Sequence, residues 1–456
     1  MKNRFCYVIF CTIFLFLISV ISCKVDKRPS ANEVISAIDS AFGSVTSTVS
    51  HKTKHKSNIE IYLDGTGSVA GLIRKAKIDS LTSYETGTTS YCKFLKTLDA
   101  YLRGKQDTFQ IYQFGEYSSR INKFDEALKN TFYDQRYTRL GELIEDFTSR
   151  DTGNLPKAFL VITDGIQSVA GEDDFRKVVD GVSRWLAKGL HFEILGFRSE
   201  FNGEVFCETE GGTKIGWYRS DSFGLRPFYC YVFSYERGFG KSLAQGLQAN
   251  YGDSLPNMMD LSSNLFETPV IEFKTPARRA QKDINWLQPR ITEGGVKYFY
   301  WKGKTNELLS GEFRTFINLN LTQESKNFKI TKYGIKTIVQ CINLDSNKLR
   351  IEDYPINYEV LNAVPESQPS RLEISYTIKE TKNPYWLGYR FIVLPGDGTV
   401  QPPKWVENWS TQSDDQLADF SKTLSLKEFI SSIMLKTKFL EQPMAVFYIA
   451  IKGRKQ

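Results

Sequence analysis

Residues 59–71 read IEIYLDGTGSVAG, and they predict a buried strand followed by a cluster of polar residues. Its first residues are mostly apolar, as in a short buried strand, and Asp64 follows them directly. Beyond the aspartate, Thr66 and Ser68 alternate with glycines, which permit tight turns and a close approach of the backbone to a ligand. One carboxylate and two hydroxyls at a strand end are oxygen donors of the kind that a hard divalent cation prefers.

Strands alternate with helices from residue 57 to about residue 250. The candidate strands are residues 58–63, 108–114, 157–163, 191–197 and 227–233. Residues 172–189 predict a helix, because an apolar stripe repeats at helical spacing, acids fill the first turn and a glycine follows the last turn. This alternation is typical of an α/β fold whose parallel sheet is covered by helices on both faces.

Three loops of this fold carry polar residues that we expect to meet at one edge of the sheet. Asp64 and Asp164 each end a predicted strand, and open α/β sheets bind their ligands at the carboxyl ends of the strands. Thr138 stands just before a predicted helix, residues 140–147. Two carboxylates and several hydroxyls should therefore converge there.

The same residues resemble the metal-ion-dependent adhesion site (MIDAS) of von Willebrand factor A (vWA) domains. The family motif Asp-x-Ser-x-Ser is matched by Asp64, Thr66 and Ser68, with threonine in the middle place, and the family's further threonine and aspartate are matched by Thr138 and Asp164. The resemblance implies a doubly wound, mostly parallel, Rossmann-like sheet. It also implies that Mg²⁺, or Mn²⁺ or Ca²⁺, is bound and that an Asp or Glu carboxylate of a protein partner completes the coordination.

Two other classes of function are alternatives to this one. In a structural scaffold of an envelope complex, the ion would only stabilise the fold. A hydrolase is the third reading, because YLDGTGS resembles the haloacid-dehalogenase phosphatase motif, but Tyr62 stands where that motif has its nucleophilic aspartate. The chain also shows no GxSxG, P-loop or Ser-His-Asp signature, so we predict that it is not an enzyme.

The first residues resemble the signal of a bacterial lipoprotein. Lys2 and Arg4 precede an apolar stretch, residues 5–21, which ends in Val-Ile-Ser before Cys23, the cysteine that would be lipidated. An uncleaved membrane anchor is the alternative, since about 18 apolar residues can just span a bilayer. Both interpretations hold the protein in the cell envelope by a membrane anchor. Because Lys24 is not the aspartate of an inner-membrane retention signal, the outer membrane is favoured, and the membrane face stays open.

Charge and cysteines narrow the possible partners further. The formal net charge of +7 falls to +5 when Lys2 and Arg4 leave with the signal, and no segment concentrates basic residues as a nucleic-acid site would. We therefore expect no nucleic acid. Cys207 and Cys230 could close a disulfide in an oxidising envelope, and free buried thiols are the alternative.

These patterns divide the chain into four parts: a signal peptide (1–22), a lipidated tether with a short amphipathic helix (23–56), the vWA domain (57–262) and a β-rich domain (265–456). In the last part residues alternate in polarity, as in FRTFINLNL and LEISYTIK, which indicates a sandwich-like β fold. One C-terminal helix is expected from the apolar side formed by Leu426, Phe429, Ile430, Ile433 and Met434.

Overall fold

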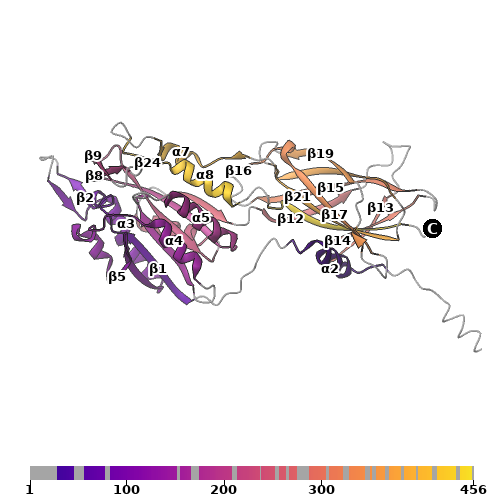
Figure 1. Ribbon diagram of the computed structural model, residues 1–456, viewed down its shortest axis with the longest axis horizontal. Coiled ribbons are helices and arrows are strands. Elements are labelled where there is room, and N and C mark those ends of the chain that lie inside the picture. The colour runs from indigo at the N-terminus through magenta and orange to yellow at the C-terminus, as the bar shows by residue number, and fades with distance from the viewer. Residues whose placement is uncertain are drawn as a thin grey trace, which may run out of the picture.

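The structure is a computed structural model in which the described residues are 28–45, 56–77, 83–150, 155–165, 174–207, 213–236, 238–251, 256–262, 266–274, 287–303, 308–321, 328–344, 350–351, 356–364, 369–381, 385–396, 399–412, 419–437 and 442–453. They form two bodies that follow one another along the long axis of the molecule (Figure 1). The predicted signal and Cys23 lie outside the described residues. Within them, no helix is long and apolar enough to cross a membrane. The protein is α/β, with several separate sheets.

The first body is built on a seven-stranded sheet in the order β11-β7-β10-β6-β1-β4-β5. Its strands are β1 (Lys56–Asp64), β4 (Thr108–Phe114), β5 (Ser119–Ile121), β6 (Pro156–Thr163), β7 (His191–Ser199), β10 (Arg226–Ser234) and β11 (Asn257–Ser262). β1 pairs in parallel with β4 and β6, and the other four pairings are antiparallel. The sheet is therefore mixed, not mostly parallel as predicted, because the chain leaves β7, forms a hairpin and returns as β10 between β6 and β7.

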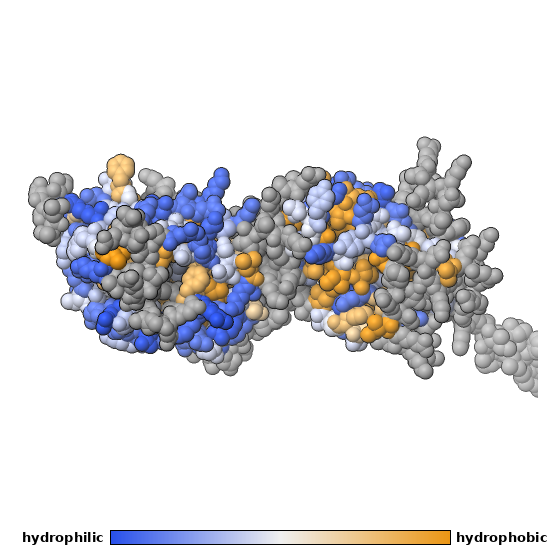
Figure 2. Space-filling view, turned by 45° about the horizontal axis from the view of Figure 1, so that its top comes forward, coloured by the Kyte–Doolittle hydropathy of each residue, from blue (hydrophilic) through white to orange (hydrophobic). Residues whose placement is uncertain are grey.

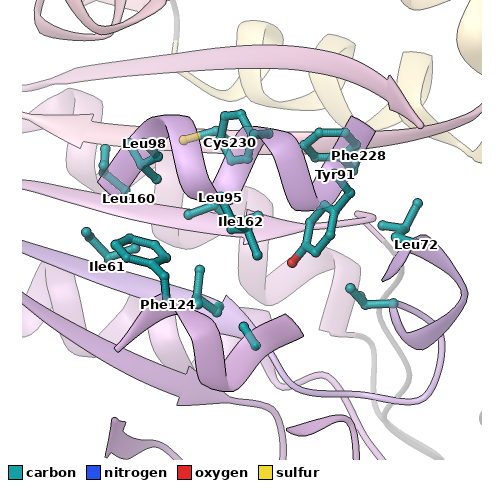
Figure 3. Close-up of a cluster of buried hydrophobic side chains, with 14 of the residues drawn as sticks. Ile61, Leu72, Tyr91, Leu95, Leu98, Phe124, Leu160, Ile162, Phe228 and Cys230 are labelled. Atoms are coloured by element: carbon teal, nitrogen blue, oxygen red, sulfur yellow. The ribbon is translucent and has the colours of Figure 1, made fainter. Parts of the chain in front are cut away.

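Helices cover both faces of this sheet, as the sequence predicted. α3 (Ser90–Gly104) and α6 (Phe239–Tyr251) share one hydrophobic cluster with the sheet, and α4 (Leu140–Ser149) and α5 (Asp174–Ala187) share the other. Figure 3 shows the first cluster, in which Leu95 and Leu98 of α3 lie over Ile61 and Ile162 of the sheet. These side chains are fully buried, so close packing holds α3 in a fixed position on the strands.

Short elements connect the layers of the first body. They are η1 (Ala70–Ile73), β2 (Arg74–Ala76), β3 (Tyr84–Thr86), η2 (Phe124–Leu128), η3 (Asn130–Phe132), β8 (Phe201–Cys207) and β9 (Thr213–Ser220). β8 and β9 form the hairpin between β7 and β10. In the described residues, β8 of this hairpin packs on η1 and β2.

A C-terminal segment belongs to the first body, although the sequence assigned it to the β-rich domain. This insertion, residues 404–437, contains α7 (Lys404–Trp409), β23 (Ser410–Thr411), β24 (Thr423–Leu424) and α8 (Leu426–Lys436). Ile430 and Ile433 of α8 are fully buried in the same cluster as α5, and the rings of Phe175 and Phe429 meet with 6.0 Å between their centroids. Figure 1 shows α8 lying along α5. The predicted apolar side of α8 is correct, but its partner is the first body.

The second body is a sandwich of two sheets, as expected. One has the order β12-β15-β20-β19, and the other β13-β14-β25-β21-β17-β18. The strands are β12 (Phe266–Lys274), β13 (Leu287–Glu293), β14 (Val296–Trp301), β15 (Leu309–Leu321), β17 (Lys336–Asn343), β18 (Arg350–Ile351), β19 (Ile356–Val364), β20 (Arg371–Thr381), β21 (Trp386–Leu394) and β25 (Ala445–Lys452), with β16 (Phe328–Lys329), η6 (Lys332–Gly334) and β22 (Thr399–Val400) beside them. Alternate residues such as Phe313, Ile317 and Ile374 fill the core between the sheets.

The helix of the predicted tether, α2 (Ala31–Phe42), is packed on the outer face of the six-stranded sheet. Val34 and Ile38 are fully buried against residues of that sheet, including Trp386. Arg390, also fully buried, donates to the Asp39 carboxylate and to the Gly43 carbonyl, both at 2.7 Å. The second body therefore combines the first described helix with the last strand, and the first body is inserted between them.

Candidate metal centre

Asp64 is the last residue of β1, and the loop that follows folds back onto its carboxylate. The backbone N–H of Thr66 donates to Oδ1 of Asp64 at 3.0 Å, and the Thr66 hydroxyl donates to the same oxygen at 2.6 Å. The N–H of Gly65 donates to the Phe114 carbonyl at the end of β4 at 2.8 Å, which ties the loop to the sheet. β1 and its loop therefore present a carboxylate and a hydroxyl as one rigid unit.

The hydroxyls of Thr66, Ser68 and Thr138 form a continuous chain. Oγ1 of Thr66 lies 3.2 Å from Oγ of Ser68, and the Thr138 hydroxyl donates to Oγ1 of Thr66 at 3.2 Å. Thr138 reaches this position because Gln135, in the same loop, pairs with Thr66 and its N–H donates to the Gly65 carbonyl at 3.1 Å. The loop before α4 is thereby attached to the loop after β1.

The end of β6 adds Thr163 and Asp164 to the cluster. The Thr163 hydroxyl donates to Oδ2 of Asp64 at 2.7 Å and accepts from the N–H of Gly165 at 3.1 Å. Sequence reasoning missed Thr163, although a hydroxyl residue beside the strand-ending aspartate was a visible signal. Gly165 has φ +80, and a side chain there would lie 3.1 Å from the ring of Tyr229, so glycine is needed at this turn. All five residues predicted from the sequence gather at this edge of the sheet, which we call the metal edge.

Burial and like charge define the electrostatics of the metal edge. Asp64 is fully buried and Asp164 is 1% exposed. Burial, together with the negative charge of Asp164, raises the pKa of Asp64 from its ordinary value of 3.8 to about 7, although hydrogen bonds from Thr66 and Thr163 oppose the rise. Two buried carboxylates held together in this way are costly to ionise, and a cation placed between them would relieve that cost.

The donor set has the composition that a hard divalent cation requires. Mg²⁺ takes an octahedron of oxygens, is held through one or two carboxylates and keeps several waters. Here Asp64 and Asp164 would supply anionic oxygens, and the hydroxyls of Thr66, Ser68 and Thr138 would supply neutral ones. The described residues contain no group of three or more His, Cys, Asp or Glu that could hold a metal. The set at the metal edge differs from such a group, because it has only two carboxylates and its other three donors are hydroxyls.

The hairpin β8–β9 packs beside the metal edge. A side chain at Gly67 would lie 3.6 Å from the ring of Phe206, and one at Gly71 would clash with the ring of Phe201 at 2.4 Å. The hairpin therefore packs tightly against the loop and the η1 turn that follow Asp64.

A groove of about 440 Å³ opens beside the metal edge, on the α4 side of the sheet. Tyr62, Tyr112 and Tyr117 contribute to its lining together with charged residues that include Glu142 and Arg150. The rings of Tyr62 and Tyr112 are stacked with 4.9 Å between their centroids. The groove reaches the loop of Thr138, since Arg139 also lines it. This aromatic and charged surface was not predicted.

Of the two cysteines that could close a disulfide, Cys230 is a free thiol. Cys230 lies within β10, fully buried, and carries a free thiol whose pKa is raised by burial. The pairing with Cys207, the last residue of β8, is therefore not formed. Cys92 is also a free, buried thiol. The alternative of buried free thiols describes these two cysteines, which are shielded from oxidants by the core around them.

Comparison with known proteins gives no family for this chain: no family model matches it, and no curated protein matches it.

Proposed function

We propose that the first body is a vWA-type domain and that its metal edge is a MIDAS-type cation site. The support is that five residues from three separate loops gather at one buried place: Asp64, Thr66, Ser68 and Thr138 are joined by hydrogen bonds, and the buried carboxylate of Asp164 lies close enough to raise the pKa of Asp64. Helices on both faces of the sheet and the place of each residue at a strand end or before a helix fit the family pattern. The antiparallel β10 between β6 and β7 is a departure from a mostly parallel sheet.

The function we propose is cation-dependent binding of a protein partner. Mg²⁺, Mn²⁺ or Ca²⁺ would be held by few anionic ligands and would therefore keep its attraction for a further oxygen. An Asp or Glu carboxylate of the partner is the matching group. Residues 1–23 support the further proposal that this happens at a membrane of the cell envelope, with Cys23 as the lipid anchor. We propose no catalytic residue.

Binding of the paramagnetic ion Mn²⁺ tests the site directly. We expect the full chain to bind one Mn²⁺ at the metal edge, measured by electron paramagnetic resonance, and Asp64→Asn to abolish this binding because one anionic ligand is lost. Asp99→Asn is the matched control, since Asp99 lies on α3 and pairs with Arg103 at 2.7 Å, away from the cluster. Absence of Mn²⁺ binding in the unaltered chain, or full binding in Asp64→Asn, would overturn the proposal.

A purely structural ion remains the second candidate because the site is so deeply buried. None of the five residues is more than 7% exposed. The two functions differ in whether the bound ion can accept an external carboxylate. Water-proton relaxation with bound Mn²⁺ separates them: an ion that serves adhesion or assembly retains exchangeable water, and acetate displaces it. If the relaxation shows no exchangeable water and does not respond to acetate, the ion serves only the fold.

A further inference from the structure

Arg226 brings a buried positive charge to the metal edge. It is the first residue of β10, and the register of the antiparallel pair sets Tyr229 opposite Thr163, so that Arg226 lies beyond the end of β6. Its Nη2 is 4.0 Å from Oδ2 of Asp164, and the side chains of both residues are almost fully buried, at 6% and 0% exposure. This pair could not be predicted from the sequence, because Arg226 stands just before the predicted strand 227–233 and carries no local signal for a contact with Asp164.

Contacts from several elements hold the guanidinium of Arg226 in place. Besides the ion pair with Asp164, its Cζ lies 4.8 Å from the centre of the Phe201 ring in the hairpin. Its Nη1 donates to the carbonyl of Phe420, in the insertion, at 3.2 Å. A buried charge with this many fixed partners cannot move into solvent at low cost. Arg226 is therefore a permanent part of the electrostatics of the metal edge.

We propose that Arg226 is a built-in counter-cation that lowers the affinity of the metal edge for a divalent cation and makes cation and acidic ligand bind cooperatively. This inference rests on the proposed function. With Asp64 and Asp164 ionised, Arg226 leaves a net charge of −1, so it removes part of the attraction for an incoming cation and also repels it. Once a divalent cation is bound, the net charge becomes +1. That excess positive charge favours an anionic group at the site, and the group in turn favours the cation.

The alternative is that Arg226 only anchors the hairpin and the insertion to the first body. A variant of Arg226 would then lower stability without changing the affinity for the cation. Arg198 provides the comparison, because it lies on the adjacent strand β7 and also contacts the insertion, with its Cζ 4.7 Å from the centre of the Trp409 ring. No ion pair joins it to the carboxylates in the described contacts of the metal edge.

The test measures the dissociation constant of Mn²⁺, with and without acetate, for the full chain and four variants. We expect Arg226→Gln to bind Mn²⁺ at least tenfold more tightly and to lose the enhancement by acetate, because the interaction between close buried charges is strong. Arg226→Lys should stay within about threefold of the unaltered chain because the charge is kept, and Arg198→Gln should not change the constant. Arg226→Met, whose apolar stem keeps the contact with Phe201, repeats the test if glutamine disturbs folding.

The outcomes separate this inference from the function on which it rests. Tighter Mn²⁺ binding in the neutral variants supports the counter-cation. Unchanged or weaker binding in a folded neutral variant, with β10 amides still protected from exchange, overturns it and leaves the cation site intact. If the unaltered chain and all variants bind no Mn²⁺, the proposed function is refuted and this inference with it.

Discussion

Replacing Asp64 with asparagine should change how stability depends on pH. The pKa of Asp64 is raised from 3.8 to about 7 in the folded protein, so the folded state holds its proton more tightly than the unfolded state does. The stability that comes from this proton is fully present below about pH 4 and is lost as the pH rises through 7. The whole rise corresponds to roughly 4 kcal/mol, of which about 2–3 kcal/mol falls between pH 5 and pH 8.

Asparagine cannot ionise, so the variant lacks this loss. With EDTA present, we expect the free energy of unfolding of Asp64→Asn to rise relative to that of the unaltered chain by about 2–3 kcal/mol from pH 5 to pH 8. Any fixed cost of the altered hydrogen bonds to Thr66 and Thr163 cancels in this comparison. Saturation with Mg²⁺ should act in the opposite direction, since ~100 times the dissociation constant stabilises the unaltered chain by roughly 2.7 kcal/mol and leaves the variant unchanged.

Amide hydrogen exchange in β1 and β6 is the suitable measurement. A global melt would mix the transitions of two bodies, whereas the protection of these strands reports the stability of the first body alone. A difference between variant and unaltered chain that stays constant from pH 5 to pH 8 would refute the reasoning, because it would mean that ionising Asp64 beside Asp164 costs nothing.

Three further changes test the packing around the site. Asp39→Ala leaves the buried guanidinium of Arg390 without its carboxylate and should destabilise the second body by about 1–3 kcal/mol, seen in urea unfolding; no loss would mean that α2 is not held by this pair. Ile430→Ala should cost about 2–5 kcal/mol and lower amide protection in α5 but not in β25, whereas the reverse pattern would assign α8 to the second body. Gly71→Ala should cost about 1–3 kcal/mol and raise exchange in the hairpin, because the new methyl group meets the ring of Phe201; Gly87→Ala, where space is open but φ is +82, serves as a control for backbone strain alone.

Local patterns in the sequence were enough to predict the elements around the metal edge. The apolar run before Asp64 became β1, residues 108–114 became β4, and the stripe containing Val178, Val182 and Trp185 became α5. The convergence of Asp64, Thr138 and Asp164 could be predicted as well, because parallel strands must end at the same edge of a sheet. Whether these residues bind a cation is a prediction that awaits measurement.

The features that were missed depend on contacts between distant parts of the chain. The apolar side of α8 was evident, but nothing local indicates that Phe429 packs on Phe175. The residues of β10 are apolar, as in any buried strand, so the sequence does not indicate that β10 lies antiparallel between β6 and β7. Arg226 reaches Asp164 only because of that insertion, and the same absence of a local signal explains why it was missed.

Each of the two bodies contains segments that are far apart in the sequence, and this affects when each body can fold during synthesis. By residue 262 every strand of the first sheet has been synthesised, yet the apolar surface of α5 stays uncovered until α8, residues 426–436, has followed. The second body must wait longer, because β25 occupies a place between β14 and β21 and ends at Lys452. The cluster beneath α3 and α6 can form once residue 262 has been made, whereas the cluster that α5 shares with α8 and the core of the second body can be completed only late in synthesis. Apolar surface should therefore stay exposed on the growing chain until these later elements have been made, which favours aggregation.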